Sequence, residues 1–397
     1  MMRPLLPLLL LAPALPAQQN WTSGQLGQVA YELGGEVRFR GELRDTANQA
    51  TGLGGSEDSL AVRGAVEFGA VYDEYISGRL RAIGTVTDAA GSDEQDLELA
   101  YLDLDRFLGD YHVRLGRMQF DLGDGRLVSR NPWLYQQNAF DGIMVGDSDW
   151  EGDWQVWFSE AATGPAEVDD NSFGGAFLAL PLDDDLLEVY VLRRGDGATA
   201  LLEWTYALRW TGETANGLGW NVLGAFQDGR DRSLEVLSYA FVTTLHKRLD
   251  YGHNVAVELA WARGNDDRPQ DRKRFDPVYI DQHRYNGRAD IVAFSNLVDL
   301  GLFYWLDWNE RWSFHVDLHD FSRQNSFDDI YLGLDVMPVT AAPGGSNDIG
   351  QELDVYAEGR ISEAVAVDFG ISYFDPGEAM PHDEDQLWFF LDFSLYF

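Results

Sequence analysis

The chain ends with LWFFLDFSLYF, residues 387–397, in which large apolar side chains occupy every second position. Because successive side chains of a β-strand point to opposite faces, one face of such a strand is entirely apolar. The other face mixes aromatic residues with Asp392 and Ser394. A strand with one fully apolar face and one mixed face is typical of a transmembrane β-barrel, whose outside meets lipid and whose inside meets a wet lumen.

The two ends of the chain both indicate the outer membrane. The terminal residue, Phe397, resembles the signal read by the machinery that inserts outer-membrane barrels. Residues 1–17, MMRPLLPLLLLAPALPA, carry one positive charge and a leucine-rich run too short to span a bilayer, which predicts a secretory signal peptide. Cleavage after Ala17 or after Ala14 would fit. We therefore expect residues 18–397 to form one β-barrel in the outer membrane of a Gram-negative type cell.

The composition excludes several classes of protein. The chain has 66 acidic and 29 basic residues, a formal charge of −37, so nucleic acid is not an expected partner. Cysteine is absent, which excludes a disulfide scaffold and thiolate metal sites. No apolar run of membrane-helix length follows the signal peptide, so a barrel in contact with outer-membrane lipid is the remaining way to span the membrane.

Alternation with a period of two predicts eighteen antiparallel strands. They cover residues 33–44, 59–72, 74–87, 96–104, 111–118, 140–147, 152–160, 171–180, 185–194, 200–210, 217–227, 236–246, 252–263, 298–308, 311–322, 350–358, 363–374 and 385–397. An even strand number would place both termini in the periplasm, with short turns there and longer loops outside.

The lengths of the connections agree with that arrangement. Short links near residues 72, 149, 309 and 361 fall on the periplasmic side, and the long connections 119–139, 264–297 and 323–349 fall outside. A soluble two-sheet sandwich is the alternative for the fold, since it needs turns at similar spacing. It does not account for the signal peptide, the lipid-like faces and the loop asymmetry together.

The phase of each strand indicates which side chains face the lumen, because an arginine on the lipid side at mid-depth costs about 2–4 kcal/mol. The lumen-facing basic residues of the early strands are Arg38, Arg40, Arg44, Arg63, Arg79, Arg81 and Arg114. In the later strands the lumen-facing charged residues are mainly acidic, the last of them being Asp368 and Asp392. Arg209 is an exception. The closing strand should place Asp392 beside Arg38 and Arg40, at the seam between a basic and an acidic wall.

Two interpretations of this charged lumen stay open. Arginine and carboxylate side chains can pair across any polar lumen merely to satisfy one another. Alternatively, they form a charged constriction, since arginine rings are one way to build an anion-selective pore. The chain contains only two lysines, Lys247 and Lys273, so nearly every cation is a planar guanidinium that binds carboxylates in a bidentate manner.

A run of motifs begins after the fifth predicted strand. The first is LGRMQFDLGDGRLVSRNPWLYQQNAFDGIMV, residues 115–145, with two GR pairs and an FDG. It is followed by FDPVYIDQHRYNGRAD at 275–290, DLHDF at 317–321, IGQELDVYAEGR at 349–360 and SYFDPGEA at 372–379. In this order the motifs resemble those of the alginate-export family of outer-membrane proteins. The resemblance implies an eighteen-stranded barrel, in agreement with the count from periodicity.

The resemblance also implies a function, the passive passage of an anionic, uronate-type polysaccharide through an arginine-lined lumen. The residues that match by motif are Arg117, Arg126, Asp141, Arg284, Glu352 and Asp354. Arg288, in the same motif as Arg284, is also expected on this path. Two positions depart from the family pattern, Met118 and Asn138, and Arg130 could replace the missing cation only if its loop folds inward.

Motifs for catalysis are missing from the sequence, and no enzyme is expected. The chain has no HExxH, no GxSxG and no phosphate-binding glycine loop. His315, Asp317 and His319 alternate on one strand and could bind a metal, but alternate polar residues are what a lumen strand needs. The only cofactor that we consider is weakly bound calcium at acidic loops, for which solvated turns are the alternative. These runs are Asp183 to Asp185 and the series Asp147, Asp149, Glu151 and Asp153.

Three functions of different classes remain. The first is an exporter of an anionic polysaccharide, for which a periplasmic helical-repeat scaffold protein would be a partner. The second is a general or oligosaccharide-uptake porin of the same fold. The third is an outer-membrane enzyme or adhesin. The direction of transport, the solute, the loop that narrows the lumen and the oligomeric state do not follow from the sequence.

Overall fold

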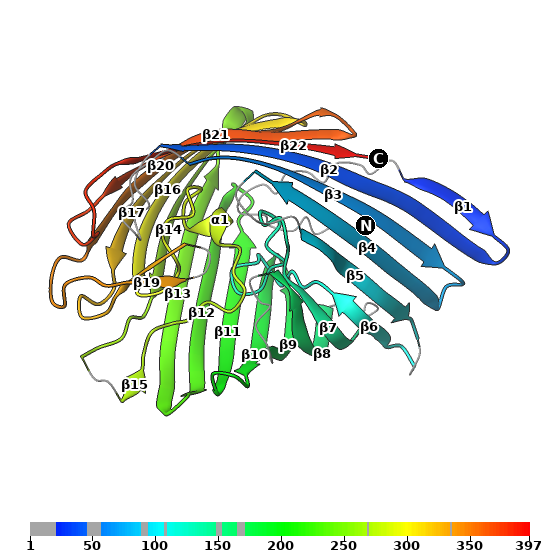
Figure 1. The fold of residues 1–397 in the computed structure, drawn as a ribbon, viewed down its shortest axis with the longest axis horizontal. Coiled ribbons are helices and arrows are strands. Elements are labelled where there is room, and N and C mark those ends of the chain that lie inside the picture. Colours follow the sequence, from blue (N-terminus) through cyan, green and yellow to red (C-terminus); the bar gives the residue numbers. More distant parts are fainter. Residues whose placement is uncertain are drawn as a thin grey trace.

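Eighteen antiparallel strands close into a barrel in the computed structural model (Figure 1). The structure describes residues 21–45, 57–88, 94–106, 109–147, 153–164, 171–267, 270–333 and 336–397. The predicted signal peptide, residues 1–17, lies outside this part. The barrel closes where β2 pairs with β22, the strand whose sequence suggested the fold.

The strands of the barrel agree with the eighteen predicted from periodicity. They are β2 (Val29–Asp45), β3 (Glu57–Val71), β4 (Ile76–Thr87), β5 (Glu94–Leu104), β6 (His112–Met118), β7 (Ala139–Asp147), β8 (Asp153–Thr163), β9 (Asn171–Leu182), β10 (Asp185–Asp196), β11 (Leu201–Glu213), β12 (Leu218–Asp231), β13 (Leu234–Arg248), β14 (His253–Ala262), β16 (Leu297–Asn309), β17 (Trp312–Arg323), β20 (Asp348–Ser362), β21 (Val365–Pro376) and β22 (Gln386–Tyr396).

A few short elements accompany the barrel. β1 (Thr22–Leu26) pairs with the start of β2, and β15 (Asp271–Arg272) runs parallel to β13. β18 (Ile330–Leu332) and β19 (Met337–Val339) form a separate hairpin. The helical segments of the described residues are η2 (Asp250–Gly252) and α1 (Gln282–Tyr285). Neither of these short helices could cross a membrane.

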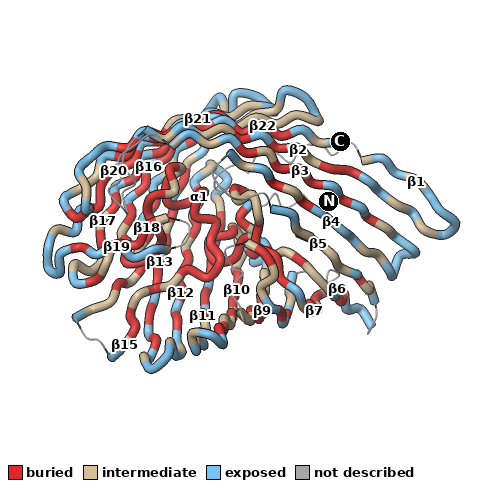
Figure 2. Tube along the Cα trace, viewed as in Figure 1, coloured by how far each residue is buried: buried red, intermediate tan, exposed pale blue. Residues whose placement is uncertain are grey.

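The two faces of β22 separate as the alternation predicts. Leu387, Phe389 and Leu391 point outward and are 41%, 49% and 51% exposed. Trp388 and Asp392, on the opposite face, are 0% and 6% exposed. The same alternation of buried and exposed residues repeats along the other strands (Figure 2). The outward side chains therefore form the apolar belt that a barrel in lipid requires.

The connections divide between the two ends of the barrel as predicted. At one end, called the turn end, β16 joins β17 and β20 joins β21 through short turns, and the terminal Phe397 exchanges backbone hydrogen bonds with Gly35. At the opposite end, called the loop end, the three long connections leave β6, β14 and β17. Which end faces the periplasm stays a prediction from the strand count.

Two of the long connections were wrongly expected to lie outside the barrel. Residues 119–138, the first inner loop, and the described residues of 263–296, the second inner loop, fold back between the strands. Figure 2 shows the segments around α1 as largely buried. Phe120, Val128, Phe275 and Phe294 are each 3% exposed or less, which a loop outside the barrel would not achieve. The interior of the barrel is therefore crossed by its own chain.

Candidate functional site

The first inner loop is fastened to the wall formed by β2 and β3. Arg38 Nη1 donates to the carbonyl of Pro132 at 2.9 Å, and Arg40 Nη2 donates to the carbonyl of Trp133 at 2.8 Å. The Arg40 guanidinium also lies 3.3 Å from the centre of the Trp133 ring. Guanidinium groups suit this task because each presents several donors in a fixed fork.

The opposite side of the first inner loop is fastened to strands across the lumen. Asp124 lies 3.0 Å from Arg209 Nε on β11, and Arg126 lies 2.5 Å from Glu258 on β14. Asp124 and Arg126 lie in a tight turn, in which Gly125 N–H donates to the carbonyl of Leu122. Gly125 has a φ of +82°, a conformation that favours glycine. The loop thus spans the lumen from β2 to β14.

The second inner loop binds the first by backbone pairing. Val128 and Tyr279 form a parallel bridge, in which Ser129 N donates to Tyr279 O at 2.8 Å and Tyr279 N donates to Leu127 O at 3.0 Å. The Trp133 ring stacks on His283 with 3.7 Å between the ring centres. The two loops therefore form one structure inside the barrel.

The carboxylates of β20 hold the second inner loop by its backbone. Glu352 accepts the N–H of Ala289 at 2.8 Å, and Asp354 accepts the N–H of Arg288 at 3.2 Å. The Arg288 side chain then lies 2.8 Å from Glu358. Glu352 and Asp354, predicted on the solute path, are thus engaged in fixing a loop.

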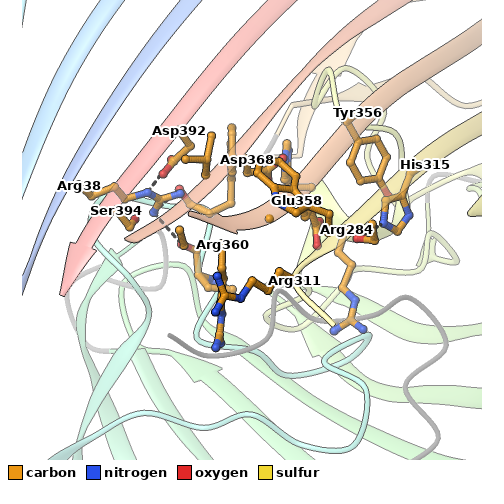
Figure 3. Close-up of a pocket in the computed structure, with 18 of the residues that line it drawn as sticks. Arg38, Arg284, Arg311, His315, Tyr356, Glu358, Arg360, Asp368, Asp392 and Ser394 are labelled. Carbon is orange, nitrogen blue, oxygen red and sulfur yellow. Dashed lines mark hydrogen bonds and ion pairs between the residues drawn. The ribbon is translucent and has the colours of Figure 1, made fainter. Parts of the chain in front are cut away.

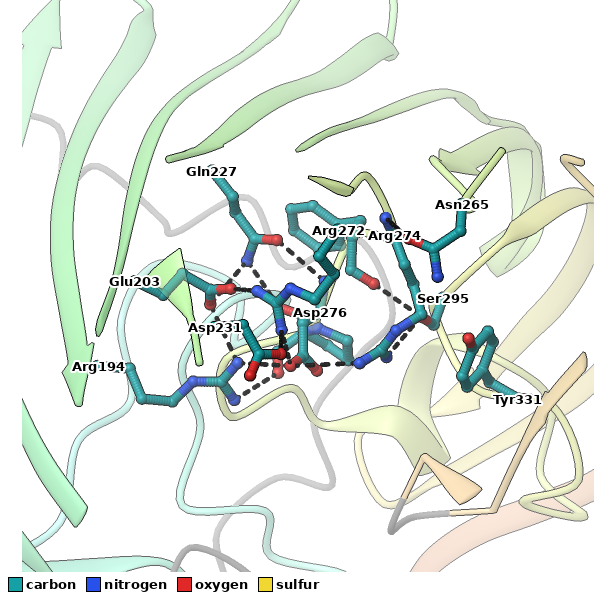
Figure 4. A network of polar contacts seen from close by, with 12 residues as sticks. Arg194, Glu203, Gln227, Asp231, Asn265, Arg272, Arg274, Asp276, Ser295 and Tyr331 are labelled. Carbon is teal, nitrogen blue, oxygen red and sulfur yellow. Dashed lines mark hydrogen bonds and ion pairs between the residues drawn. The ribbon is translucent and has the colours of Figure 1, made fainter. Parts of the chain in front are cut away.

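A cluster of charges fixes the other side of the second inner loop (Figure 4). The Asp276 carboxylate lies 2.8 Å from Arg194, 3.0 Å from Arg272 and 3.6 Å from Arg274. Burial alone would raise the pKa of Asp276, but Arg194, Arg274 and Arg272 together hold it below its ordinary value. Asp276 therefore stays ionised among the three guanidinium groups.

A row of polar groups runs through α1 beside Trp133. Arg288 Nη1 donates to His283 Nε2 at 3.2 Å, so the proton of a neutral His283 is on Nδ1, 2.9 Å from Asp290 Oδ2. Burial lowers the pKa of His283 well below its usual range, which keeps the ring neutral. Burial also raises the pKa of Asp290 to about 8, against the opposing charges of Arg44 and Arg288.

A cavity of about 490 Å³ lies between the inner loops and the turn end of the barrel (Figure 3). Its lining includes seven arginines and seven acidic residues, whereas the whole chain has 29 basic and 66 acidic residues. The cavity is thus strongly enriched in guanidinium groups. Its arginines are Arg38, Arg81, Arg130, Arg284, Arg288, Arg311 and Arg360.

The predicted site residues fall into three groups. Five of them line the cavity, namely Arg38, Arg81, Arg130, Arg284 and Arg288. Others hold the inner loops, namely Arg40, Arg63, Arg126, Arg209, Glu352 and Asp354. The remainder, Arg79, Arg114, Arg117 and Asp141, form ion pairs along the barrel wall and are not among the lining residues. Arg130 reaches the cavity because its loop folds inward.

The wall pairs show why some predicted residues do not reach the cavity. Arg117 lies 2.8 Å from Asp141, which is on the same strand face as the exposed Ile143. Arg114 forms a bidentate pair with Asp103 at 2.7 and 3.0 Å. The predicted seam is confirmed, since Asp392 lies 2.6 Å from Arg38 and 2.8 Å from Arg40.

Two arginines of the cavity were not predicted from the sequence, Arg311 and Arg360. Arg360 shares the inward face of β20 with Glu352 and Glu358, so the strand phase could have indicated it. Arg311 lies in the turn between β16 and β17, where alternation gives no signal.

Metal binding finds no support among the described residues, where no group of three acidic or histidine side chains could hold an ion. The trio His315, Asp317 and His319 is engaged otherwise: His319 Nδ1 lies 2.9 Å from Asp299, and His315 stacks on Tyr356. Of the acidic runs considered for calcium, Asp149 and Glu151 lie outside the described residues. The calcium prediction therefore stays untested.

Solved structures with a similar fold are outer-membrane proteins of Pseudomonas aeruginosa. OccK11 (OpdR) has a TM-score of 0.63 at 14% identity, with 96% of this chain and 99% of that chain covered. OpdL has a TM-score of 0.66 at 14% identity, with coverages of 92% and 99%. OpdK, solved with vanillate, has a TM-score of 0.63 at 13% identity, with coverages of 92% and 99%.

A comparison with curated proteins found no match. The family model for alginate export, in contrast, matches residues 29–387, nearly the whole chain. Together with the porin-like barrel, this match makes the protein an outer-membrane channel and not an enzyme. The order of motifs, the closed barrel and the family match agree, and the chain belongs to the alginate export family.

Proposed function

We propose that the barrel is a passive channel for an anionic, uronate-type polysaccharide or oligosaccharide. The observation that carries this proposal is the cavity, where arginines equal acidic residues in number although the chain as a whole is strongly acidic. A guanidinium pairs with a carboxylate through two parallel hydrogen bonds and stays charged at any physiological pH. A uronate carries one carboxylate per sugar, so each residue of the solute has a group that these arginines bind.

Export is the direction that the family supports best. Residues 18–397 would then form the mature channel after removal of the signal peptide, with a periplasmic helical-repeat protein as the expected partner. Co-purification of such a protein with the tagged channel from outer membranes would support this assignment, and a channel isolated repeatedly without one would argue against it.

The second candidate, uptake of short acidic oligosaccharides, is favoured by two observations. The two inner loops cross the lumen and hold each other by backbone pairing, which suits small solutes better than a moving polymer. OpdK, a structure of similar fold, was solved with vanillate, a small carboxylate.

Planar-bilayer recordings test the proposal and separate the two candidates. Under a salt gradient, the zero-current potential should show anion preference, and trigalacturonate should block the current where neutral maltotriose does not. Cation preference together with no block by trigalacturonate would reject an anionic solute. Galacturonate chains of increasing length then show how long a solute the channel passes. Passage of long chains supports a polymer channel, and passage of short chains alone supports the oligosaccharide porin.

A further inference from the structure

Arg311 and Arg360 differ from the other five arginines of the cavity. Those five have partners within the protein: Arg38, Arg81, Arg130 and Arg288 form ion pairs, and Arg284 donates to a backbone carbonyl. Among the described residues, neither Arg311 nor Arg360 has an ion-pair partner or a side-chain hydrogen bond.

The fold places these two arginines side by side. The backbone N–H of Arg360, near the end of β20, donates to the carbonyl of Arg311, in the β16–β17 turn, at 2.9 Å. Figure 3 shows both side chains directed into the same part of the cavity. The Nε and Nη2 atoms of Arg360 are buried without a hydrogen-bond partner. Two cations thus lie together at the wall of the cavity, and one of them, Arg360, has buried donors.

The nearby carboxylates do not neutralise the pair. Glu358 and Asp368 both face Arg288, at 2.8 and 3.7 Å. Asp307 accepts a hydrogen bond from Asn254 at 3.0 Å. Glu310, in the same turn as Arg311, is exposed and forms no ion pair within the described part of the chain.

A buried cationic donor without a partner is unfavourable, and in native proteins such groups mark places where an ion or ligand binds. Two guanidinium forks side by side match the two oxygens of a carboxylate. We propose that Arg311 and Arg360 form a subsite for the carboxylate of a uronate at the turn end of the lumen. This assignment rests on the proposed function. It places the subsite at the end of the path, where the solute binds first or last depending on the direction of transport.

The position of the subsite gives the channel a polarity. The subsite lies in the cavity at the turn end, on the other side of the inner loops from the loop end. A solute added at the turn end reaches Arg311 and Arg360 without passing the inner loops. Block by an acidic oligosaccharide should therefore be tighter from this side than from the other.

The double variant R311Q/R360Q tests the subsite, with R230Q/R232Q as the matched control. Arg230 and Arg232 likewise have no side-chain partner in the described residues, but they are exposed and lie at the loop end. Both double variants remove the same charge. Because Arg311 is in a turn and the Arg360 side chain has no partner, R311Q/R360Q should remain a folded barrel, which heat-modifiable mobility in gels verifies.

The measurement is the dissociation constant for block by trigalacturonate, added to either side of an oriented planar bilayer. We expect R311Q/R360Q to weaken block from the turn end by about tenfold, the size of one lost charge-assisted contact. R230Q/R232Q should change it by less than about twofold, as expected for a distant screened charge. R311K/R360K, which keeps the charge and loses the fork, should bind more weakly than the native channel.

Different failures have different meanings. If the native channel is not blocked by trigalacturonate from either side, the proposed function fails. If the native channel is blocked and R311Q/R360Q is blocked equally well, only the subsite is wrong. Inorganic phosphate that displaces trigalacturonate more effectively than free galacturonate does would overturn the assignment to a carboxylate.

Discussion

Arginine in this protein mainly joins parts of the fold to one another. Arg209 is 4% exposed and lies between Asp124 of the first inner loop, at 3.0 Å, and Glu188 of β10, at 2.8 Å. Such a residue connects a loop to the wall through two buried ion pairs. It contributes to the channel by keeping the loop in place.

Replacement of Arg209 by methionine should therefore be costly. The R209M change removes the cation that Asp124 and Glu188 share, and removal of one partner from a buried pair costs about 3–5 kcal/mol. Urea unfolding in detergent micelles, followed by tryptophan fluorescence, would measure the loss. R193M is the control, because within the described residues the Arg193 side chain donates only to Ser172 Oγ, at 3.0 Å, and its loss should cost about 1 kcal/mol. Equal midpoints for the two variants would contradict the role of Arg209.

Asp290 makes the attachment of the second inner loop inside the barrel depend on pH. We call this attachment docking. Its pKa is about 8 in the docked loop, beside Arg44, Arg288 and His283, and returns to its ordinary value of 3.8 when the loop is exposed. The docked loop thus binds the proton more tightly, so docking is strongest below about pH 4 and weakens until about pH 8.

The D290N variant isolates this effect. Between pH 6 and 8, the docking equilibrium of the native protein should fall by up to about tenfold per pH unit, and that of D290N should stay nearly constant. Asp281, whose pKa burial raises to about 6, titrates mostly below this window. Hydrogen exchange of residues 280–290, corrected for the intrinsic rate at each pH, is the measurement. A native protein with flat protection from pH 6 to 8 would show that Asp290 does not control docking.

At the scale of elements, the inner loops decide how wide the channel is. β6 and β7 remain paired up to Met118 and Phe140, and Gln119 Nε2 donates to Gln137 Oε1 at 3.2 Å. The two ends of the first inner loop are therefore close together. A short turn could join these strands without the loop.

Deletion of residues 120–137, replaced by Gly-Ser-Gly, should leave the barrel closed and raise its single-channel conductance several-fold. The second inner loop would lose its pairing partner at Val128 and its contact with Trp133, so both obstacles in the lumen are weakened. The same tripeptide inserted into the β12–β13 turn, at the same end of the barrel, is the control. An unchanged conductance in the deletion variant would mean that the solute path avoids the first inner loop.

At the scale of the whole molecule, the barrel depends on its closing seam. β2 and β22 pair from Glu36 with Tyr396 to Asp45 with Leu387, and Asp392 binds both Arg38 and Arg40. Beyond this pairing, Gly35 leaves room for the ring of Phe397. A Cβ on Gly35 would lie 2.6 Å from Phe397 Cζ and 2.5 Å from the carbonyl oxygen of Ala65.

The G35V variant should therefore fold poorly. Overpacking of this kind costs about 1–3 kcal/mol, and here it acts at the contact that closes the barrel. G41V is a close control on the same strand, because a Cβ on Gly41 meets nothing within 4 Å. The fraction of heat-modifiable protein after refolding into detergent would compare the two variants. Equal refolding yields would show that the Phe397 contact is unimportant for closure.

The wall could be predicted from the sequence, whereas the lumen could not. Each strand residue faces either lipid or the interior, so the alternation in β22 and the count of strands led to the seam of Asp392 with Arg38 and Arg40. The inner loops have no such rule. Asp276 or Arg126 would suit an outer loop as well as the interior, and only contacts with distant strands decide between them. For the same reason, strand phase could not distinguish Arg209, which holds a loop, from Arg81, which lines the cavity.

The parallel bridge between Val128 and Tyr279 has a consequence for how the current through the channel fluctuates. Two independent obstacles would produce several conductance levels, as each one moved alone. Because these loops share backbone hydrogen bonds and the stacked rings of Trp133 and His283, displacement of one removes contacts of the other. The recorded current should then switch between two levels in single steps, with intermediate levels appearing only in variants that break the bridge.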